Sequence, residues 1–349
     1  MMISMKKRIS IVDVAQLANT STTTVSRIIN DTGYPVSEDV RKRVIKAVEE
    51  LKFTPSISAQ QLRQDFSQMI GLIARDIAAE FFGEIAKGAT ERAMELGCLS
   101  FICNTGREAS NEFKFHELLW RNRVRGVVLI GGGYDTEEYR VMMHRQLERA
   151  NHFGFRIVTN TPQGFDMPSV TIDHKDAFNR LTEYLIAKNH RTIALITADK
   201  RVYTSREHRD GFEAALRNHD LPISDTLIRF HSFTEQGGYI SCKEIMQQSP
   251  RPTAICCGCD PIALGALRAI NELGLSVPED ISIVSFGNTS VATHLYPALT
   301  SIDVPRYRMG AMAVEMILTD LYEKETNIIL PTKLIERESV RFLEDPCPL

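Results

Sequence analysis

Residues 13–30 read DVAQLANTSTTTVSRIIN, and the pattern of this stretch decides the fold of the N-terminal end. Apolar residues recur at helical spacing on both sides of a polar break at Asn19 and Thr20, which predicts two short helices. Ser21 is a suitable N-cap for the second of them. A third helix is expected after Ser37, a candidate cap, because an apolar stripe follows. The stripe consists of Val40, Val44, Ile45, Val48 and Leu51.

The exposed face of the second predicted helix combines small hydroxyl and amide side chains with one arginine. It consists of Thr22, Thr23, Ser26, Arg27 and Asn30. Short polar side chains reach base edges or phosphates in a major groove, and a guanidinium pairs with guanine through two hydrogen bonds. Residues 1–65 also carry ten Lys or Arg against seven Asp or Glu, so +3 of the net charge of −3 lies here and −6 elsewhere. The N-terminal end is therefore the candidate nucleic-acid surface; the alternative is a helix face that contacts only solvent.

The composition is that of an ordinary soluble chain. It has 349 residues, 43% of them hydrophobic and 24% charged, which suits about two or three domains. No apolar run of about 18 residues is present, and the start, MMISMKKRIS, lacks the apolar stretch of a secretion signal. We therefore expect a cytoplasmic protein without a membrane partner. Seven cysteines, an odd number without framework spacing, favour reduced thiols over disulfides.

After Gln68, apolar strands alternate with longer helical patterns, which predicts an α/β fold with parallel sheets built from βαβ units. The predicted strands are 70–74, 99–103, 127–130, 156–158, 193–197, 253–257 and 281–286. Two groups of strands suggest two lobes. Ligands of open α/β sheets bind at the carboxyl ends of the strands, so a cleft between the lobes is the expected small-molecule site.

The segments DVAQLANTSTTTVSRIIN, VSEDVRKRVIKAVEELKFTPS and AQQL resemble the start of the LacI/GalR family of bacterial repressors. The likeness continues over nearly the whole chain through IGLIARDI, GVVLIGGG, HRTIALIT, RDGFEAAL, DPIALGALRAINELGLSVPEDISIVSF and PALTSIDVP. It implies an all-α helix-turn-helix headpiece (1–55), a hinge helix (56–67) and a two-lobed periplasmic-binding-protein-like domain (68–349). The implied N-lobe is 68–171 and 299–329, and the implied C-lobe is 172–298 and 330–345. The chain would cross between them near Ile172, His294 and Leu330.

For DNA contact, the resemblance implies that the hinge segment forms a short helix on the duplex. Leu62 matches the leucine that enters the minor groove, and Ala59 would lie on the same helix face; a plain linker is the alternative. Thr22 and Thr23 stand at the positions that choose the operator's bases. Asn19 replaces the family's usual turn glycine, and asparagine tolerates the left-handed conformation. The residues expected at DNA are Ser10, Ser21, Thr22, Thr23, Ser26, Arg27, Asn30, Ala59 and Leu62.

The effector positions depart from the family pattern. His208 replaces the usual arginine before Gly211 and Phe212, Cys259 replaces the asparagine before the retained Asp260, and Gly287 and Asn160 replace two acids. The expected cleft thus has fewer acidic residues and retains Arg75, His208 and also Arg206. We therefore hypothesise an anionic effector such as a sugar phosphate or sugar acid. The alternative is that these side chains face solvent. The expected effector residues are Arg75, Phe82, Asn160, Asp173, Thr204, His208, Cys259 and Gly287.

Other motifs support little chemistry. Gly131–Gly133 follow a strand, but the dinucleotide pattern and a P-loop lysine are missing. Cys256, Cys257 and Cys259 have no second pair at zinc spacing, so no metal and no cofactor are expected. A redox role for Cys259 would require an exposed, electropositive setting. No catalytic constellation is found, so the chain is not expected to be an enzyme.

The sequence therefore predicts an effector-responsive repressor that binds a pseudo-palindromic operator as a homodimer. Effector binding would change the angle between the lobes and lower the affinity for DNA, and the family implies carbohydrate genes as targets. The end, RFLEDPCPL, lacks a leucine heptad, which favours a dimer over a tetramer. Alternatives are a regulator that needs a corepressor, and a small-molecule binding protein or enzyme on the same two-lobed fold.

Overall fold

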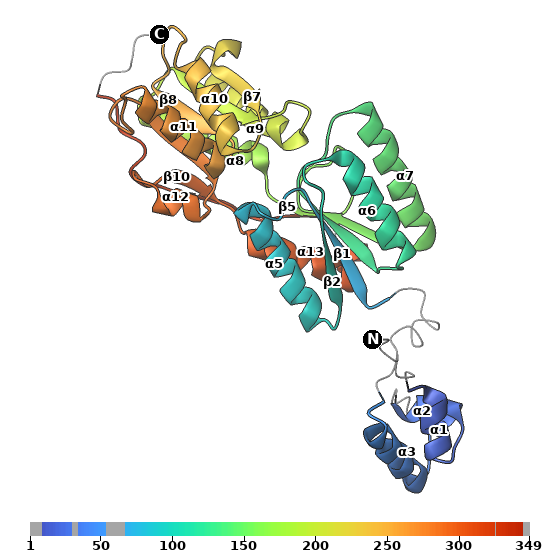
Figure 1. Cartoon of the computed structure of the whole chain (residues 1–349). Coiled ribbons are helices and arrows are strands. Elements are labelled where there is room, and N and C mark those ends of the chain that lie inside the picture. Colours follow the sequence, from blue (N-terminus) through green and yellow to red (C-terminus); the bar gives the residue numbers. More distant parts are fainter. Residues whose placement is uncertain (1–8, 30–33, 54–66, 325, 345–349) are drawn as a thin grey trace, which may run out of the picture. The chain divides into compact units, whose positions relative to one another are not determined.

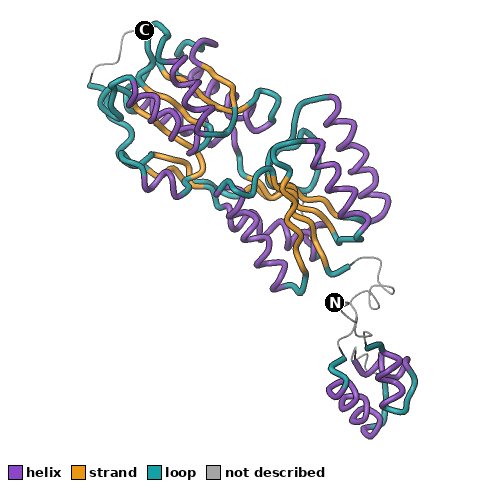
Figure 2. The backbone as a smooth tube through the Cα atoms, viewed as in Figure 1, coloured by secondary structure: helices purple, strands orange, loops and turns teal. Residues whose placement is uncertain are grey.

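The computed structural model describes residues 9–29, 34–53, 67–324 and 326–344. The chain divides into two compact units, Met1–Ser67 and Gln68–Leu349. Figure 1 labels the elements of both units, and Figure 2 distinguishes their helices, strands and loops. The two units are described separately below.

The first unit contains three helices: α1 (Ile11–Leu17), α2 (Thr22–Ile29) and α3 (Glu38–Glu50). The predicted cap Ser21 accepts a hydrogen bond from the Thr24 amide at 3.1 Å. Asn19 has the left-handed φ of 46° that the turn requires. The helices close a small core of Val14, Ala15, Ala18, Val25, Ile28, Val44 and Ala47.

Two details of the third helix differ from the sequence prediction. Ser37 occupies the cap position, but its side chain makes no capping hydrogen bond. Ile45, expected in the apolar stripe, is exposed, and Ala47 is buried in the core in its place. The reason is the spacing: Val44 and Ala47 lie three residues apart on the face toward α1, and Ile45 is rotated about 100° from Val44 around the helix axis.

The N-lobe of the second unit contains a parallel sheet of six strands in the order β11-β5-β4-β3-β1-β2. Their bounds are β1 Met69–Ala74, β2 Leu99–Asn104, β3 Gly126–Ile130, β4 Arg156–Thr159, β5 Ser169–Thr171 and β11 Asn327–Ile329. In Figure 1 one pair of helices covers each face of this sheet. One pair is α5 (Glu80–Glu95) with α13 (Arg306–Leu318), and the other is α6 (Ala109–Arg121) with α7 (Glu137–Phe153).

The C-lobe repeats the same strand order in its sheet, β12-β10-β9-β8-β6-β7, with only β12 antiparallel to its neighbour. Its strands are β6 Ile193–Ala198, β7 Ile228–His231, β8 Ala254–Cys257, β9 Ser282–Gly287, β10 Thr300–Asp303 and β12 Lys333–Ile335. The flanking helices are α8 His174–Ala187, α9 Tyr203–Asn218, α10 Glu235–Ile245 and α11 Asp260–Glu272. Shorter elements are the 3₁₀ turn Asp225–Leu227, α12 Ser290–His294 and α14 Leu321–Lys324.

Alternation along the C-lobe strands sorts their side chains onto two faces. In β6, Ile193 and Leu195 belong to the core beneath α8 and α9, whereas Ala194 and Ile196 belong to the core beneath α10 and α11. Both faces of the strand are buried, as a parallel sheet covered by helices requires. This explains why the strand is apolar throughout rather than alternating with polar residues.

The crossings between the lobes follow from the two sheets. The first lies at Ile172 and the third at Leu330, between strands of different sheets. The predicted second crossing near His294, and with it the lobe boundary at residue 299, is wrong. Strand β10 still pairs with β9 in the C-lobe, so the chain crosses only at Val304–Pro305, before α13. Strand β10, TSID, is short and has one apolar residue, Ile302, so its sequence does not show which of the two sheets it joins.

Candidate functional site

The first candidate site is the exposed start of helix α2. Thr22 and Thr23 are exposed there, one residue after the capping Ser21. Helix N-termini present free backbone amides that favour anions such as phosphate. The two threonines therefore lie on a surface where a short hydroxyl side chain can reach a nucleic acid.

Further along α2, the guanidinium of Arg27 lies over the ring of Tyr34, 3.8 Å from its centroid. This cation–π contact links the end of α2 to the segment before α3, and Ser26 lies half-buried beside it. Ser10 is committed to a capping box at α1, where its side chain and amide both bond to Asp13. Asn30, Ala59 and Leu62, also predicted at DNA, lie outside the described residues.

The second candidate site is a cavity of about 540 Å³ in the second unit. Residues of both lobes line it, including Arg75 and Phe82 from the N-lobe and Thr204, His208 and Cys259 from the C-lobe. Most of them directly follow a strand or begin a helix at the carboxyl edge of a sheet, where open α/β sheets bind ligands. The predicted cleft between the lobes is thus a feature of the fold.

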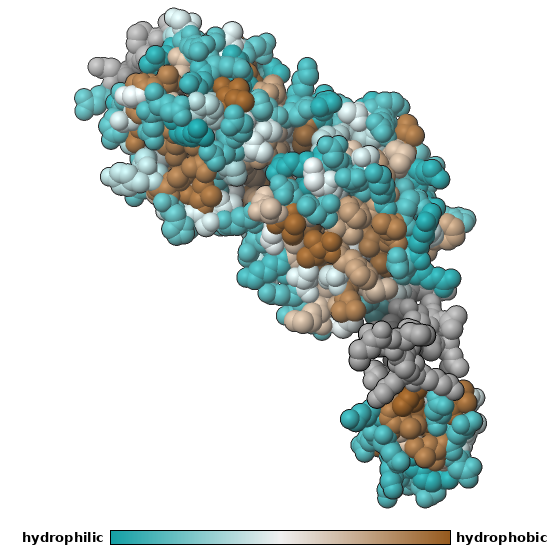
Figure 3. All heavy atoms as spheres, in the orientation of Figure 1, coloured by the Kyte–Doolittle hydropathy of each residue, from teal (hydrophilic) through white to brown (hydrophobic). Residues whose placement is uncertain are grey.

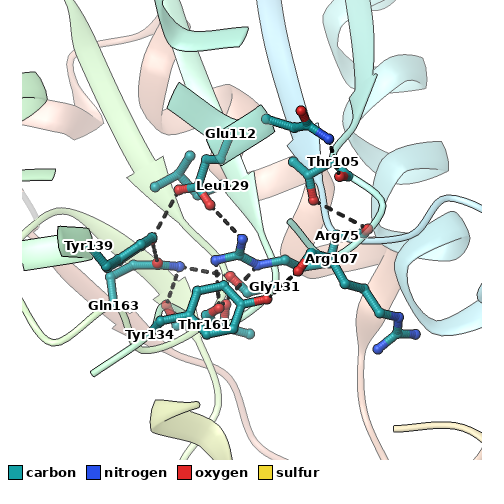
Figure 4. Close-up of polar contacts among 12 residues, drawn as sticks. Arg75, Thr105, Arg107, Glu112, Leu129, Gly131, Tyr134, Tyr139, Thr161 and Gln163 are labelled. Atoms are coloured by element: carbon teal, nitrogen blue, oxygen red, sulfur yellow. Dashed lines mark hydrogen bonds and ion pairs between the residues drawn. The ribbon is translucent and has the colours of Figure 1, made fainter. Parts of the chain in front are cut away.

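Arg75, at the end of β1, is held by a buried network (Figure 4). Its guanidinium is 2.6 Å from a carboxylate oxygen of buried Glu112 and donates to the Gly132 carbonyl at 2.7 and 3.1 Å. The Tyr134 ring lies against it, 4.5 Å from the guanidinium carbon. Burial lowers the pKa of Arg75, but Glu112, Tyr139 and Tyr134 together outweigh this effect and the pKa is raised. Arg75 therefore remains a cation whose charge is already neutralised within the protein.

The same network continues away from the cavity through Tyr139 and Gln163. The Tyr139 hydroxyl lies 3.0 Å from Glu112 and 2.6 Å from Gln163 Oε1, so two acceptors compete for one proton. The Gln163 amide donates to the Gly131 carbonyl at 2.8 Å. Arg75 and Gln163 thereby hold the backbone carbonyls of Gly132 and Gly131 in loop 131–134.

The other charged residues of the cavity wall are also matched. Arg107 pairs with Asp76 at 3.2 Å, and its side chain points away from the Arg75 network in Figure 4. Arg201 pairs with Asp199. Glu80, in the N-lobe, accepts from the amide of Ser290 in the C-lobe at 2.8 Å. The charges on the wall are thus balanced before any ligand enters.

Asp260 begins α11 and is satisfied by hydroxyl and amide donors. One carboxylate oxygen accepts from Ser285 at 2.5 Å and from Ser301 at 3.2 Å, and the other accepts from the amide and hydroxyl of Thr289 at 2.7 and 2.8 Å. Burial nevertheless raises the pKa of Asp260. This residue organises the loop after β9 rather than presenting a free carboxylate.

Imidazole and phenyl rings form much of the remaining wall. His208 stacks on Phe178 with centroids 3.8 Å apart, and the rings of His174 and Phe286 each lie within 5.6 Å of it. Both imidazoles are buried. Burial lowers the pKa of His174 to about 4 and that of His208 well below its usual value, so both are neutral near pH 7.

The structure places the predicted effector residues in two groups. Five of them line the cavity: Arg75, Phe82, Thr204, His208 and Cys259. Three do not, which corrects the sequence-based set. The amide of Asn160 donates to the carbonyls of Val170 and Met309, the side chain of Asp173 caps α8, and Gly287 is not among the lining residues.

Two chemical hypotheses lose their support. The anionic effector rested on Arg75, His208 and Arg206, but Arg75 is paired with Glu112, His208 is neutral, and Arg206 pairs with Asp135 away from the wall. The redox role of Cys259 needed a thiolate. Burial raises the pKa of its thiol to about 12, so it stays protonated.

Sequence reasoning missed several wall residues. His174 follows the first crossing, and Asp199 and Arg201 follow β6. His231 and Phe233 come at and after the end of β7, a strand that was not predicted. The rule that ligands bind after strands would have indicated all of them if β7 had been recognised.

The described part of the chain has neither a metal-binding cluster nor a membrane-spanning helix. Among the residues that the structure describes, no three His, Cys, Asp or Glu side chains gather as a metal site. Within the same residues, every helix is too short or too polar to cross a bilayer.

Comparison with known proteins gives a consistent result. Residues 10–56 match bacterial regulatory proteins of the lacI family, and residues 182–340 match a periplasmic binding protein-like domain. The HTH-type transcriptional repressors PurR of Photorhabdus laumondii and Glaesserella parasuis are each 32% identical, the first over 95% of this chain and 96% of its own length, the second over 96% and 99%.

Solved structures agree with the sequence relatives. The lac repressor dimer bound to operator and the anti-inducer ONPF has a TM-score of 0.83 at 26% identity, covering 96% of this chain and all of that one. A complex of the transcriptional regulator CelR with cellobiose has a TM-score of 0.70 at 26% identity, covering 95% and 100%. Both likenesses include the headpiece and the two lobes.

Proposed function

The chain belongs to the lacI family of bacterial regulatory proteins and is an effector-responsive, DNA-binding transcriptional repressor, and from this premise we propose how it works. We propose that a homodimer places two copies of α2 in successive major grooves of a pseudo-palindromic operator. A small molecule in the cavity between the lobes would control this binding. The relatives are repressors rather than enzymes, which agrees with the predicted class.

The observation that carries the proposal is the exposed polar start of α2 on a headpiece with its own core. Thr22 and Thr23 are exposed while Val25 and Ile28, on the opposite side of the same helix, are buried. The helix is thus anchored on one face and free to contact DNA with the other. This division of faces is what a recognition helix requires.

The dimer proposal is supported by the edge strand β2. This strand pairs only with β1, and its apolar residues Leu99, Phe101 and Ile102 are exposed. Met94 and Leu118 are exposed on the flanking helices α5 and α6, and Figure 3 shows apolar atoms gathered over the part of this lobe where Figure 1 labels β1 and β2. An exposed apolar edge strand is unfavourable in a monomer. The related lac repressor is described as a dimer on operator.

Contacts between the lobes suggest how a ligand would act. The Tyr203 amide of the C-lobe donates to the Gly133 carbonyl of the N-lobe at 3.1 Å, and Ser290 bonds to Glu80 on α5. A ligand that touches both lobes stabilises one relative angle over others. Because both lobes belong to each protomer of the dimer, that angle would set the spacing of the two headpieces and hence the operator affinity.

Selection of DNA from a random pool by the purified full-length protein tests the proposal. We expect an enriched inverted repeat whose affinity falls when Arg27→Ala or Leu62→Ala is introduced. Arg43→Ala is the matched control, since Arg43 pairs with Asp39 on the exposed side of α3. Failure of the folded parent to enrich any repeat, or equal loss with the control variant, would contradict operator binding through α2.

A further inference from the structure

The cavity between the lobes contains polar atoms that the fold leaves without partners. Among the described residues, both ring nitrogens of His174, Nε2 of His208 and the hydroxyl of Thr161 are buried and make no hydrogen bond. All three side chains line the cavity, and each is at most 3% exposed. Buried polar groups are almost always paired, so these atoms indicate a missing hydrogen-bonding partner.

The hydrogen-bonding capacity of these groups defines what could pair with them. A neutral imidazole carries one N–H donor and one bare nitrogen acceptor. His174 offers both, because neither nitrogen is used; His208 offers one, because its Nδ1 contacts the Thr197 hydroxyl at 3.1 Å. The Thr161 hydroxyl, on the N-lobe, both donates and accepts. A matching ligand therefore needs at least one donor and one acceptor.

The charge balance of the wall excludes the ionic classes of ligand. Arg75, Arg107 and Arg201 are each paired with a carboxylate, and Asp260 is satisfied by hydroxyl and amide donors. A phosphate or carboxylate would have to break one of these pairs or remain unpaired in a buried site. The site favours a ligand without net charge.

The aromatic residues of the wall favour a flat ligand. Phenyl rings reach the cavity from both lobes, Phe81 and Phe82 from the start of α5 and Phe233 and Phe286 from the C-lobe. Aromatic rings bind flat rings by stacking or by edge contacts. A sugar would bring many hydroxyl groups to a wall on which buried polar atoms without partners are few: apart from Arg75, which is paired with Glu112, they belong to the two imidazoles and Thr161.

We propose that the effector is a neutral, planar heteroaromatic compound that is read by His174, His208 and Thr161 and held between the phenyl rings of the two lobes. This proposal rests on the proposed function, since it names the ligand class of the same controlling site. It replaces the anionic sugar derivative expected from the sequence. Because Thr161 belongs to one lobe and the imidazoles to the other, such a ligand would connect the lobes directly.

Calorimetric titration of the full-length protein at pH 7.5 tests the proposal with benzimidazole as the probe. Benzimidazole is flat and neutral, and it has one N–H donor and one nitrogen acceptor. Ribose, glucose and glucose 6-phosphate represent the neutral polyol and anionic classes. We expect heat of binding from benzimidazole at millimolar concentrations and none from the other three compounds.

Two variants in the cavity and one outside it show whether the named groups read the ligand. Thr161→Val replaces the hydroxyl with a methyl group of similar size, and His208→Phe keeps a ring against Phe178. Each is expected to weaken benzimidazole binding about tenfold, the loss that corresponds to one hydrogen bond. His116→Phe is the control, since His116 is equally buried with an unpartnered Nε2 but does not line the cavity. It should bind the probe as the parent does.

Three outcomes would overturn the proposal: no benzimidazole binding at saturating concentration, binding that neither cavity variant weakens, or binding of glucose 6-phosphate or a sugar instead. The operator selected from the random pool separates this result from a failure of the proposed function. A protein that binds its operator but not benzimidazole retains the regulatory function and loses only the ligand class. A protein that binds benzimidazole but no operator retains the proposed ligand class and contradicts the proposed operator binding.

Discussion

At the scale of single residues, the buried pair of Arg75 and Glu112 decides what the cavity can accept. The guanidinium is in contact with a carboxylate, a carbonyl and an aromatic ring at the same time. Arg75 therefore holds loop 131–134 in place as well as lining the cavity. The sequence shows Arg75 as a positive charge, but in the structure Arg75 and Glu112 together form a pair without net charge.

Removing the carboxylate of Glu112 should therefore destabilise the fold. Glu112→Gln leaves the buried Arg75 cation without its counter-charge, and we expect a loss of about 3–5 kcal/mol in the free energy of unfolding. Urea denaturation followed by circular dichroism measures it. Glu137→Gln is the control, since its pair with Arg140 lies at the surface and should contribute little to stability. Equal effects would mean that the buried pair has no special role.

The buried histidines predict a pH dependence of stability. Burial lowers the pKa of His116 and of His174 to about 4, below the value near 6.5 of the unfolded chain. Between these values the unfolded state binds protons that the folded state does not, so stability is complete above about pH 6.5 and falls as the pH drops toward 4. Each such histidine contributes a slope of up to about 1.4 kcal/mol per pH unit in that window.

His116→Phe isolates one of these contributions without touching the cavity. The difference in unfolding free energy between the variant and the parent should change with pH between 6.5 and 4 in favour of the variant. Urea titrations at pH 7.5, 6 and 5 measure the change. Parallel curves for the two proteins over this range would show that His116 titrates normally in the folded state.

At the scale of secondary-structure elements, the close approach of α5 and α13 depends on glycine. A Cβ at Gly88 would overlap the Tyr307 carbonyl, and one at Gly310 would overlap that of Ile85. We expect Gly88→Ala to destabilise the protein by about 1–3 kcal/mol through overpacking.

Gly83 provides a matched control on the same helix, because a Cβ there would meet only the Ile77 carbonyl at 3.6 Å. Gly83→Ala should be neutral or stabilising by up to about 1 kcal/mol, because alanine favours the helix. Thermal unfolding of both variants measures the contrast. Similar midpoints for the two would mean that α5 and α13 separate at no cost.

The edge strand β2 gives a prediction about assembly. Phe101→Lys places a charge on the exposed apolar edge, which should prevent pairing of two copies while leaving the monomer folded. Sedimentation velocity should then show a monomer and weaker operator binding. Val141→Lys, on the exposed side of α7, is the control and should remain dimeric. A variant Phe101→Lys that still sediments as a dimer would place the interface elsewhere.

Secondary-structure elements also show where sequence reasoning succeeds and where it cannot. Continuous apolar runs such as 193–198 identify buried parallel strands directly, and the helix-turn-helix follows from apolar spacing around Asn19. Strand β7, IRFH, is short and half-polar because it forms a sheet edge, so its pattern gives no signal. The wall residues His231 and Phe233 were missed together with it. Likewise, the pairing of Arg75 with Glu112 joins residues 37 positions apart and is visible only in three dimensions.

At the scale of the whole molecule, the charge is divided between the ends of the chain. Residues 1–65 carry +3 and the remainder −6. Binding of the operator should therefore depend strongly on salt, because phosphate contacts release counterions. If a dimer makes about 6–10 such contacts, affinity should fall about 10³–10⁵-fold between 50 and 200 mM salt. Fluorescence anisotropy with the selected operator measures this, and a nearly salt-independent affinity would contradict binding through the basic headpiece.

The three crossings between the lobes affect how the protein is made. Strand β11 and helix α13 complete the N-lobe, although they lie beyond residue 305, after most of the C-lobe. During synthesis, the headpiece leaves the ribosome early, whereas the N-lobe must wait until nearly the last residues have been translated. A chain truncated before β11 thus has the headpiece but lacks one strand of the N-lobe sheet. A regulator with both lobes complete therefore forms only from chains that are translated almost to their end.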